Sequence, residues 1–512
     1  MISMQFAKRI TPVQAAFFGS LLLSLAAILT NPTLNRDGIL YVETAHNFLQ
    51  GGFDAARRTF QWPFFPILMA LVSKLTGIGL EKTGHLLNAV FMAGACALLV
   101  ASAQRRVPEA IWSICLVVLA LPGPNYYREE LLREYGCWFF MMLSFWLALR
   151  WSENPRWGSA LIVQLALGIA ALFRPEALVF FAAFVMWQLF EAQKESKLRR
   201  VLMIVGLPLV VALLIFVLIG LLRGLVRVNP EGWSGYVMWH LGQVAWHLNP
   251  IQEKINNIIN LLNPAAKQAL FNVKAQALAG ALFILAKDGA GTILFLGSLA
   301  IIPLKFIKQL SLFIIPFLYL FHGGHLRSVL SRAPLFAWAF LAHLIVLSAY
   351  VIDWQFLSGR YIAVLGLLAA PFIGYGFREL LKRFPRWKHV MLFLSFVIMV
   401  TNAVSFRQGQ PYFIRAGDWL AKNTTENSRI YVESPRTAYY AGWRQSLVSD
   451  PQNRPGKTEG MPMDNYDFIV LEVSHSDTEI EPWLTRNKLR VLQHFENSRK
   501  DSVIIATNKS AP

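Results

Sequence analysis

The first apolar stretch of the chain, VQAAFFGSLLLSLAAILT (13–30), is followed almost directly by the mixed stretch LNRDGILYVETAHNFLQGG (34–52). About 20 apolar residues in a helix cross the hydrocarbon core of a bilayer, and fewer suffice when flanking side chains reach the interface. No small-residue cleavage site follows the first stretch, so we expect it to be a retained span. The second stretch is predicted to be a short amphipathic helix that carries Arg36, Asp37, Glu43 and His46.

The composition indicates a polytopic membrane protein. Of 512 residues, 55% are hydrophobic and 15% are charged, which is more apolar side chain than a soluble protein can bury. The net charge of +18 comes largely from basic clusters in short connections, such as 104–106, 194–200 and 378–388. Such clusters mark the cytoplasmic side of membrane proteins, so they argue against a nucleic-acid partner. The three cysteines lie in apolar runs and indicate neither disulfides nor a metal site.

Eleven segments are candidate spans, and about 11–13 transmembrane helices are expected. They are 13–30, 84–104, 109–122, 135–150, 158–173, 176–191, 201–222, 284–304, 333–352, 361–381 and 389–406. With the N-terminus in the cytoplasm, the basic clusters 104–106, 150–156, 194–200, 305–308 and 378–388 lie inside. The loops 31–83, 123–134, 223–283 and 353–360 lie outside. The apolar segment 309–322, which Pro316 interrupts, is predicted to be a re-entrant hairpin or a closely spaced pair of crossings.

The composition changes after residue 407. SRIYVESP, YDFIVLEVS, KLRVLQHFEN and DSVIIATN are typical of short strands, and FIRAGDWLAKNT and EIEPWLTRNK of helices between them. Residues 1–406 are therefore predicted to form a transmembrane domain, and residues 407–512 a small soluble α/β domain outside the cytoplasm. The α/β segment has no glycine-rich phosphate loop, which argues against nucleotide binding.

Ionisable residues of both signs gather at the outer ends of the spans, where a site is expected because charges near the apolar core are costly. Asp37 has two interpretations: it is the N-cap of the following helix, or it is a general base held at the membrane surface. Glu43 and His46 share a helix face, which is typical of a solvated surface but would also suit a divalent cation.

Three further stretches bring charges to the outer side. YYREELLREYGCW (126–138) is predicted to be helical, with Glu130 and Glu134 as a repulsive pair that favours a nearby cation. Arg174 and Glu176 stand where two spans meet almost without a loop; they either form a simple ion pair or leave the arginine to bind a phosphate. Arg360 and Tyr361 open a later span, so Arg174 and Arg360 are predicted to flank one anionic head group.

These motifs together resemble a known family. RDGILYVETA, YYREELLREYGCWFF, FRPEAL, SGRYIAVLGLLAAP and RIYVESPRTAYYAG occur in order over nearly the whole chain. The chain resembles the bacterial GT-C membrane glycosyltransferases, in the branch related to protein O-mannosyltransferases and the lipid A aminoarabinose transferase. The resemblance implies an inner-membrane enzyme that transfers a hexose or pentose from a polyprenyl phosphate, with inversion, on the periplasmic side. The acceptor is a lipid, a glycan or a protein.

The resemblance also implies roles for particular residues. Asp37 is then the general base, and the donor phosphate is bound by three arginines: Arg128, Arg174 and Arg360. The residues expected to bind acceptor or substrate are Glu43, Glu134, Glu176 and Tyr361. A divalent cation, Mg²⁺ or Mn²⁺, held by Glu43 and His46 stays open.

Two other classes of protein compete with this interpretation. A transporter or flippase of lipid-linked sugars is expected to carry polar groups near the membrane midplane and inverted repeats. A non-enzymatic scaffold has no reason to gather carboxylates and arginines. The nearly clean span interiors favour chemistry at the membrane surface.

Overall fold

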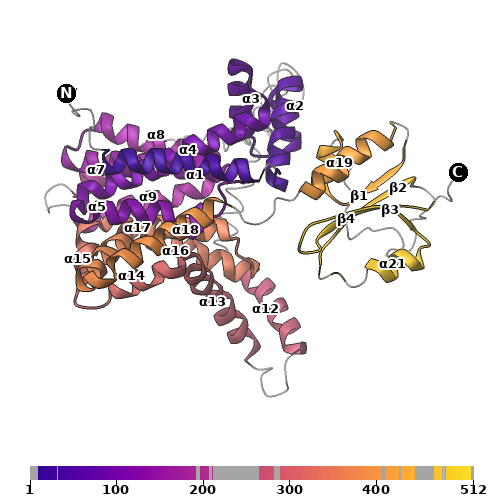
Figure 1. Ribbon diagram of the computed structural model, residues 1–512. Coiled ribbons are helices and arrows are strands. Elements are labelled where there is room, and N and C mark those ends of the chain that lie inside the picture. Colours follow the sequence, from indigo (N-terminus) through magenta and orange to yellow (C-terminus); the bar gives the residue numbers. More distant parts are fainter. Residues whose placement is uncertain are drawn as a thin grey trace, which may run out of the picture. The chain divides into compact units, whose positions relative to one another are not determined.

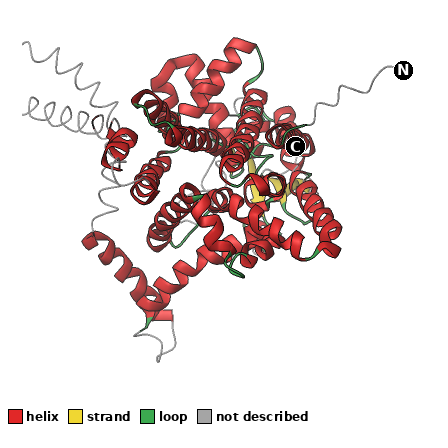
Figure 2. Ribbon diagram, turned by 90° about the vertical axis from the view of Figure 1, so that its left-hand side faces the viewer, coloured by secondary structure: helices red, strands yellow, loops and turns green. Residues whose placement is uncertain are grey.

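The computed structural model describes residues 10–31, 33–191, 197–206, 210, 264–281, 289–404, 411–425, 428–443, 466–475, 477 and 480–508. Most of the predicted span 201–222 and of the predicted loop 223–283 lies outside them. Within the described residues, five helices are long and apolar enough to cross a membrane: Pro12–Thr30, Leu80–Arg106, Ala290–Tyr319, Pro334–Trp354 and Gly359–Arg383. The predicted class is confirmed as a helical multi-pass membrane protein with a small C-terminal sheet (Figure 2).

The helices follow the apolar segments of the sequence. In chain order they are α1 Pro12–Thr30, α2 Arg36–Thr59, α3 Phe64–Thr76, α4 Leu80–Arg106, α5 Ile111–Ala120, α6 Pro122–Asn125, α7 Glu134–Glu153, α8 Trp157–Phe173, α9 Val179–Glu191, α12 Pro264–Ala281, α13 Ala290–Leu310, α14 Ile314–Tyr319, α15 His325–Arg332, α16 Pro334–Trp354, α17 Gly359–Arg383, α18 Lys388–Ala403, α19 Pro411–Asn423, α20 Pro435–Tyr440 and α21 Ile480–Arg486. Short 3₁₀ turns are η1 Pro108–Ala110, η2 Pro175–Leu178, η4 Ser311–Phe313 and η5 Pro385–Trp387. The strands are β1 Ile430–Val432, β2 Phe468–Val473, β3 Arg490–Glu496 and β4 Ser502–Thr507.

The chain forms two compact units. Figure 1 labels the helices and strands that belong to them. The first unit draws on Met1–Phe17, Gly94–Asn125 and Cys137–Ile398, and the second on Phe18–Ala93, Tyr126–Gly136 and Met399–Pro512. The second unit thus groups two of the predicted outer segments with the C-terminal strands. A domain boundary near residue 407 stays a prediction.

Helix α17 is the buried centre of the first unit. It packs against α5, α13, α14 and α16, and small residues allow the close approach. A Cβ added to Gly374 would lie 2.6 Å from the Cα of Ile114, so a larger residue there would push α5 away. The loop before α17 is thereby fixed relative to the helices around it.

The segment 305–322 differs in part from its prediction. Helix α13 ends at Leu310 because Ser311 has a φ of 51°, and the chain continues through η4 into α14. The apolar run Ala290–Tyr319 is a candidate span by length and composition, and the predicted hairpin or pair of crossings at 309–322 stays a prediction. Lys305 was expected at the cytoplasmic end of a span, yet its Nζ donates to the carbonyl oxygen of Leu357. The cluster 305–308 and the loop 353–360 therefore lie side by side and not on opposite faces.

The predicted helix at 126–138 is also wrong in its first part. Residues 126–133 form turns and irregular backbone, and α7 begins at Glu134. Two backbone groups of this segment bond to side chains: the Asn88 Nδ2 donates to the Glu130 carbonyl oxygen at 3.4 Å, and the Leu131 N–H donates to Asn35 Oδ1 at 3.3 Å. Side-chain partners thus replace the bonds that a helix would make.

The C-terminal strands form one mixed sheet in the order β1-β2-β4-β3. Strands β1 and β2 are parallel, with Ile430 opposite Phe468, and the β2–β4 and β3–β4 pairs are antiparallel. Alternate residues bury opposite faces: Val470 and Ile505 pack under α19 and α20, whereas Ile469 and Ile504 pack against α21. The predicted strands and their two flanking helices are confirmed, and α20 is an addition that the sequence did not predict.

Candidate functional site

The start of α2 is held by Asn35 and not by Asp37. Asn35 is the N-cap, and its Oδ1 accepts a hydrogen bond from the Gly38 N–H at 3.1 Å. The predicted alternative that Asp37 caps this helix is therefore wrong. Asp37 lies two residues further on, half-buried in the first turn, where the positive end of the helix dipole stabilises a carboxylate.

Asn35 also fixes the turn of Asp37 against the segment 126–136 of the same unit. Its Oδ1 accepts from the Leu131 N–H, and its Nδ2 donates to Glu130 Oε2 at 3.3 Å. A pocket of about 210 Å³ is lined here by Asn35, Glu129 and Glu130, among others. The turn that carries Asp37 is therefore rigid, as a general base requires.

Arg128 and Glu134 are buried in the same unit, with 3% and 4% of their surface exposed. The Arg128 Nη1 donates to the carbonyl oxygen of Ser20 at 2.8 Å and to the hydroxyl of Ser24 at 2.6 Å. These bonds attach the turn segment to α1, which favours a structural role for Arg128. Its predicted contact with a donor phosphate, like the substrate role of Glu134, stays a prediction.

A second group of predicted site residues lies in the first unit, around Arg174. This guanidinium is 8% exposed and sits 4.7 Å from the centre of the Tyr361 ring. Its Nη2 donates to Glu176 Oε1 at 3.2 Å, so the predicted ion pair is present. The Glu176 side chain is half exposed, whereas the arginine is held against the aromatic face. The structure thus brings Arg174, Glu176 and Tyr361 together.

Arg360 precedes Tyr361 in the first turn of α17. The N-cap Ser358 accepts the Arg360 N–H at 3.4 Å, and the His343 Nε2 lies 3.1 Å from the Tyr361 carbonyl oxygen. Both contacts fix the backbone at the start of the helix. Tyr361 is therefore next to Arg174 in space and next to Arg360 in sequence.

Two lysines that the sequence analysis did not assign to the site join this group. Lys305 lies 5.5 Å from the centre of the Phe356 ring, in addition to its bond with Leu357. The Lys274 Nζ donates to Gln355 Oε1 at 2.6 Å. The turn between α16 and α17 is thus approached by the side chains of Arg174, Lys274 and Lys305, and a fourth cationic residue, Arg360, follows the turn in the first turn of α17. We name these four side chains the cationic cluster.

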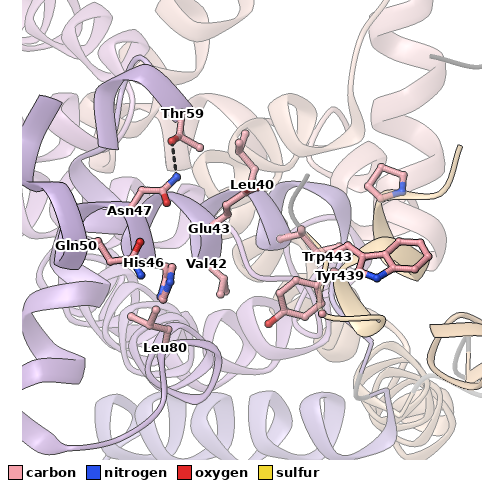
Figure 3. Close-up of a pocket in the computed structure, with 13 residues that line it drawn as sticks. Leu40, Val42, Glu43, His46, Asn47, Gln50, Thr59, Leu80, Tyr439 and Trp443 are labelled. Carbon is pink, nitrogen blue, oxygen red and sulfur yellow. Dashed lines mark hydrogen bonds between the residues drawn. The ribbon is translucent and has the colours of Figure 1, made fainter. Parts of the chain in front are cut away.

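A larger pocket, of about 810 Å³, lies in the second unit (Figure 3). Glu43 and His46 line it together with Asn47 and Gln50, because their spacing of three and four residues puts them on one face of α2. Among the described residues, no group of three or more His, Cys, Asp or Glu side chains could hold a metal ion. A cation at Glu43 and His46 stays a prediction.

The far side of this pocket comes from α20 and the residues after it. Tyr439 lines the pocket, and its hydroxyl donates to Glu81 Oε2 at 3.2 Å, while the Tyr440 hydroxyl accepts from the Leu34 N–H at 2.9 Å. Burial, and then the neighbouring Glu81, raise the pKa of Tyr439, so this phenol stays protonated and donates at neutral pH. Adjacent tyrosines thus hold α20 against the starts of α2 and α4.

The predicted residues fall into two sets. Asp37, Glu43, His46, Arg128 and Glu134 belong to the second unit, and Arg174, Glu176, Arg360 and Tyr361 to the first. Asn35, Lys305 and Trp443 were missed. The sequence could have pointed to Asn35, since asparagine is a common helix cap. It could also have pointed to Lys305, since a lysine inside an apolar span needs a partner.

No family model matches the sequence, and no curated protein matches it. The structure is similar to an oligosaccharyltransferase of Archaeoglobus fulgidus tethered with an acceptor peptide, with 10% identity, a TM-score of 0.49, and coverage of 99% of this chain and 75% of that one. It is also similar to ArnT from Cupriavidus metallidurans in the apo state, with 13% identity, a TM-score of 0.42, and coverage of 98% and 99%. ArnT bound to undecaprenyl phosphate matches with 14% identity, a TM-score of 0.40, and 98% of each chain covered.

Proposed function

We propose that the protein is a membrane glycosyltransferase that moves a sugar from a polyprenyl phosphate to an acceptor outside the cytoplasm. The observation that carries the proposal is the cationic cluster at the turn between α16 and α17. Both helices are candidate spans, so the turn lies at a membrane-span end, where a lipid-borne phosphate travels. Charges in such a place need partners of opposite sign.

The cluster gathers positive side chains at one end of two candidate spans. Glu176 neutralises part of the Arg174 charge, while Lys305 and Lys274 are bonded to uncharged groups, the Leu357 carbonyl and the Gln355 amide. A phosphate would give both lysines a partner of opposite charge, and the planar fork of Arg174 suits its oxygens.

The reaction needs little else from the protein. The bond between the anomeric carbon and the phosphate oxygen breaks as a bond from that carbon to the acceptor oxygen forms, which inverts the configuration. The developing negative charge on the phosphate is stabilised by the cationic cluster, principally Arg174, Arg360 and Lys305. Asp37 takes the proton of the acceptor hydroxyl, and polyprenyl phosphate leaves.

Comparative mass spectrometry of cells tests the proposal and does not require the acceptor to be identified in advance. Glycolipids, glycans and glycoproteins are compared between cells that contain the protein, cells that lack it and cells with the Asp37→Asn variant. We expect a hexose or pentose increment that is present only with the wild type. Identical profiles in all three strains would contradict the proposed transfer.

A further inference from the structure

The 810 Å³ pocket of the second unit has no role in the proposed chemical step. Its helical side is a stripe of hydrogen-bonding groups: Glu43, His46, Asn47 and Gln50. Its opposite side carries two aromatic residues, Tyr439 and Trp443 (Figure 3). We infer that this pocket binds the glycan part of a hydroxyl-rich acceptor, a role that rests on the proposed function.

Part of the pocket lining depends on a break in α2, because Thr59, which follows the break, lines the pocket. Gly52 has a φ of 70° and a ψ of −160°, so the helix folds back on itself there. The fold brings the Asn47 Nδ2 within 2.8 Å of the Thr59 hydroxyl, although 12 residues separate them. A straight helix would hold these residues about 18 Å apart. The bond to Thr59 thus fixes the orientation of the Asn47 amide.

The polar side matches sugar hydroxyls in chemistry. Side-chain amides such as those of Asn47 and Gln50 offer both donors and acceptors, as each sugar hydroxyl does. The Glu43 carboxylate can accept hydrogen bonds from hydroxyls, and the described residues that line the pocket include no lysine or arginine to bind a phosphate or carboxylate. The pocket therefore favours a neutral or amino-bearing glycan over an anionic one.

The aromatic side supplies flat apolar surface for the C–H faces of a sugar ring. Trp443 is half-buried, and its backbone N–H donates to the carbonyl oxygen of Ala438 at 2.9 Å, which fixes it just after α20. Tyr439 is fixed through its bond to Glu81. Rigid aromatic side chains lose little entropy on binding. Pockets of several hundred Å³ with a few fixed polar groups are typical of small-ligand sites.

A glycan array measures this binding directly. Labelled full-length protein in nanodiscs is applied to a printed array of neutral and amino-bearing di- to tetrasaccharides and of sialylated or phosphorylated ones. We expect retention on at least one neutral or amino-bearing glycan. Trp443→Ala should weaken that binding about tenfold, Gln50→Ala severalfold, and Trp443→Phe less than Trp443→Ala, since a platform remains. The matched control, Trp157→Ala, removes a tryptophan that is 57% exposed in α8 and should bind as the wild type does.

Retention on none of the neutral or amino-bearing glycans, or undiminished binding by both Trp443→Ala and Gln50→Ala, would overturn the inference. Gln50 is exposed, so its variant stays informative if Trp443→Ala does not fold. Donor consumption by the wild type is measured in parallel. Donor turnover without glycan binding refutes the pocket alone, whereas glycan binding without donor turnover refutes the proposed transfer and leaves a glycan-binding pocket.

Discussion

The change Asp37→Asn tests whether this side chain is a general base or only part of a helix start. Asn35 keeps its bonds to the Gly38 and Leu131 N–H groups at 3.1 and 3.3 Å, because it, and not Asp37, is the cap. The variant therefore keeps the helix cap, and the lost interaction of the carboxylate with the helix dipole costs about 0.3–1 kcal/mol. Turnover should nevertheless fall by about 10²–10⁴, since asparagine cannot take a proton.

Two measurements on the same preparation separate the effects. Sugar transfer from a polyprenyl-phosphate donor gives the rate, and thermal unfolding in the same detergent gives stability. The control Asn35→Ala should mainly lower stability: it removes the cap and costs about 0.5–2 kcal/mol of stability. Near-normal turnover in Asp37→Asn would refute the assignment, and Glu43 would become the next candidate.

Three other changes test separate parts of the structure. Arg174→Lys keeps the charge but loses the planar fork, so the binding of polyprenyl phosphate should weaken by about 1.5–3 kcal/mol, as measured by native mass spectrometry. Equal binding would mean that Arg174 has only a structural role, as the ion-pair partner of Glu176. Lys305→Met should weaken the same binding tenfold or more, whereas Lys308→Met, an exposed lysine one turn later, should not; equal effects would remove Lys305 from the cluster. Gly52→Ala should lower the free energy of unfolding by about 1–2 kcal/mol because Gly52 has a φ of 70°. The control Gly168→Ala, inside α8, should be neutral or stabilising. Thermal unfolding measures both variants, and an unchanged stability of Gly52→Ala would contradict the fold-back of α2.

The sequence was most informative where structure is local. Apolar length predicted the described spans, and short apolar runs rich in β-branched residues predicted β2 and β4, because both patterns follow from the geometry of a single element. The start of α2 was predicted only to within two residues. Asn35 and Asp37 are both good caps, and the choice depends on Leu131, which is 96 residues away from Asn35.

The errors arose where a distant partner decides the structure. Lys305 was predicted to be a cytoplasmic anchor because basic residues at span ends usually lie on the cytoplasmic side. That rule does not take into account a bond to a distant partner, and Lys305 bonds to a carbonyl oxygen 52 residues along the chain. Turns replaced the helix before Glu134 because Asn35 and Asn88 take up its backbone groups. Trp443 carried no local signal at all, since it meets α2 only through the fold of the second unit.

The most direct test of the proposed transfer follows one donor molecule in proteoliposomes without any energy source. A polyprenyl phosphate that carries a labelled sugar is placed in the membrane, with an extract of the cell's glycans and lipids as acceptor. We expect the label to leave the lipid, polyprenyl phosphate to accumulate, and the rate to fall by about 10²–10⁴ with Asp37→Asn. A labelled lipid that stays intact but moves to the other leaflet would contradict the account, because it would make the protein a flippase.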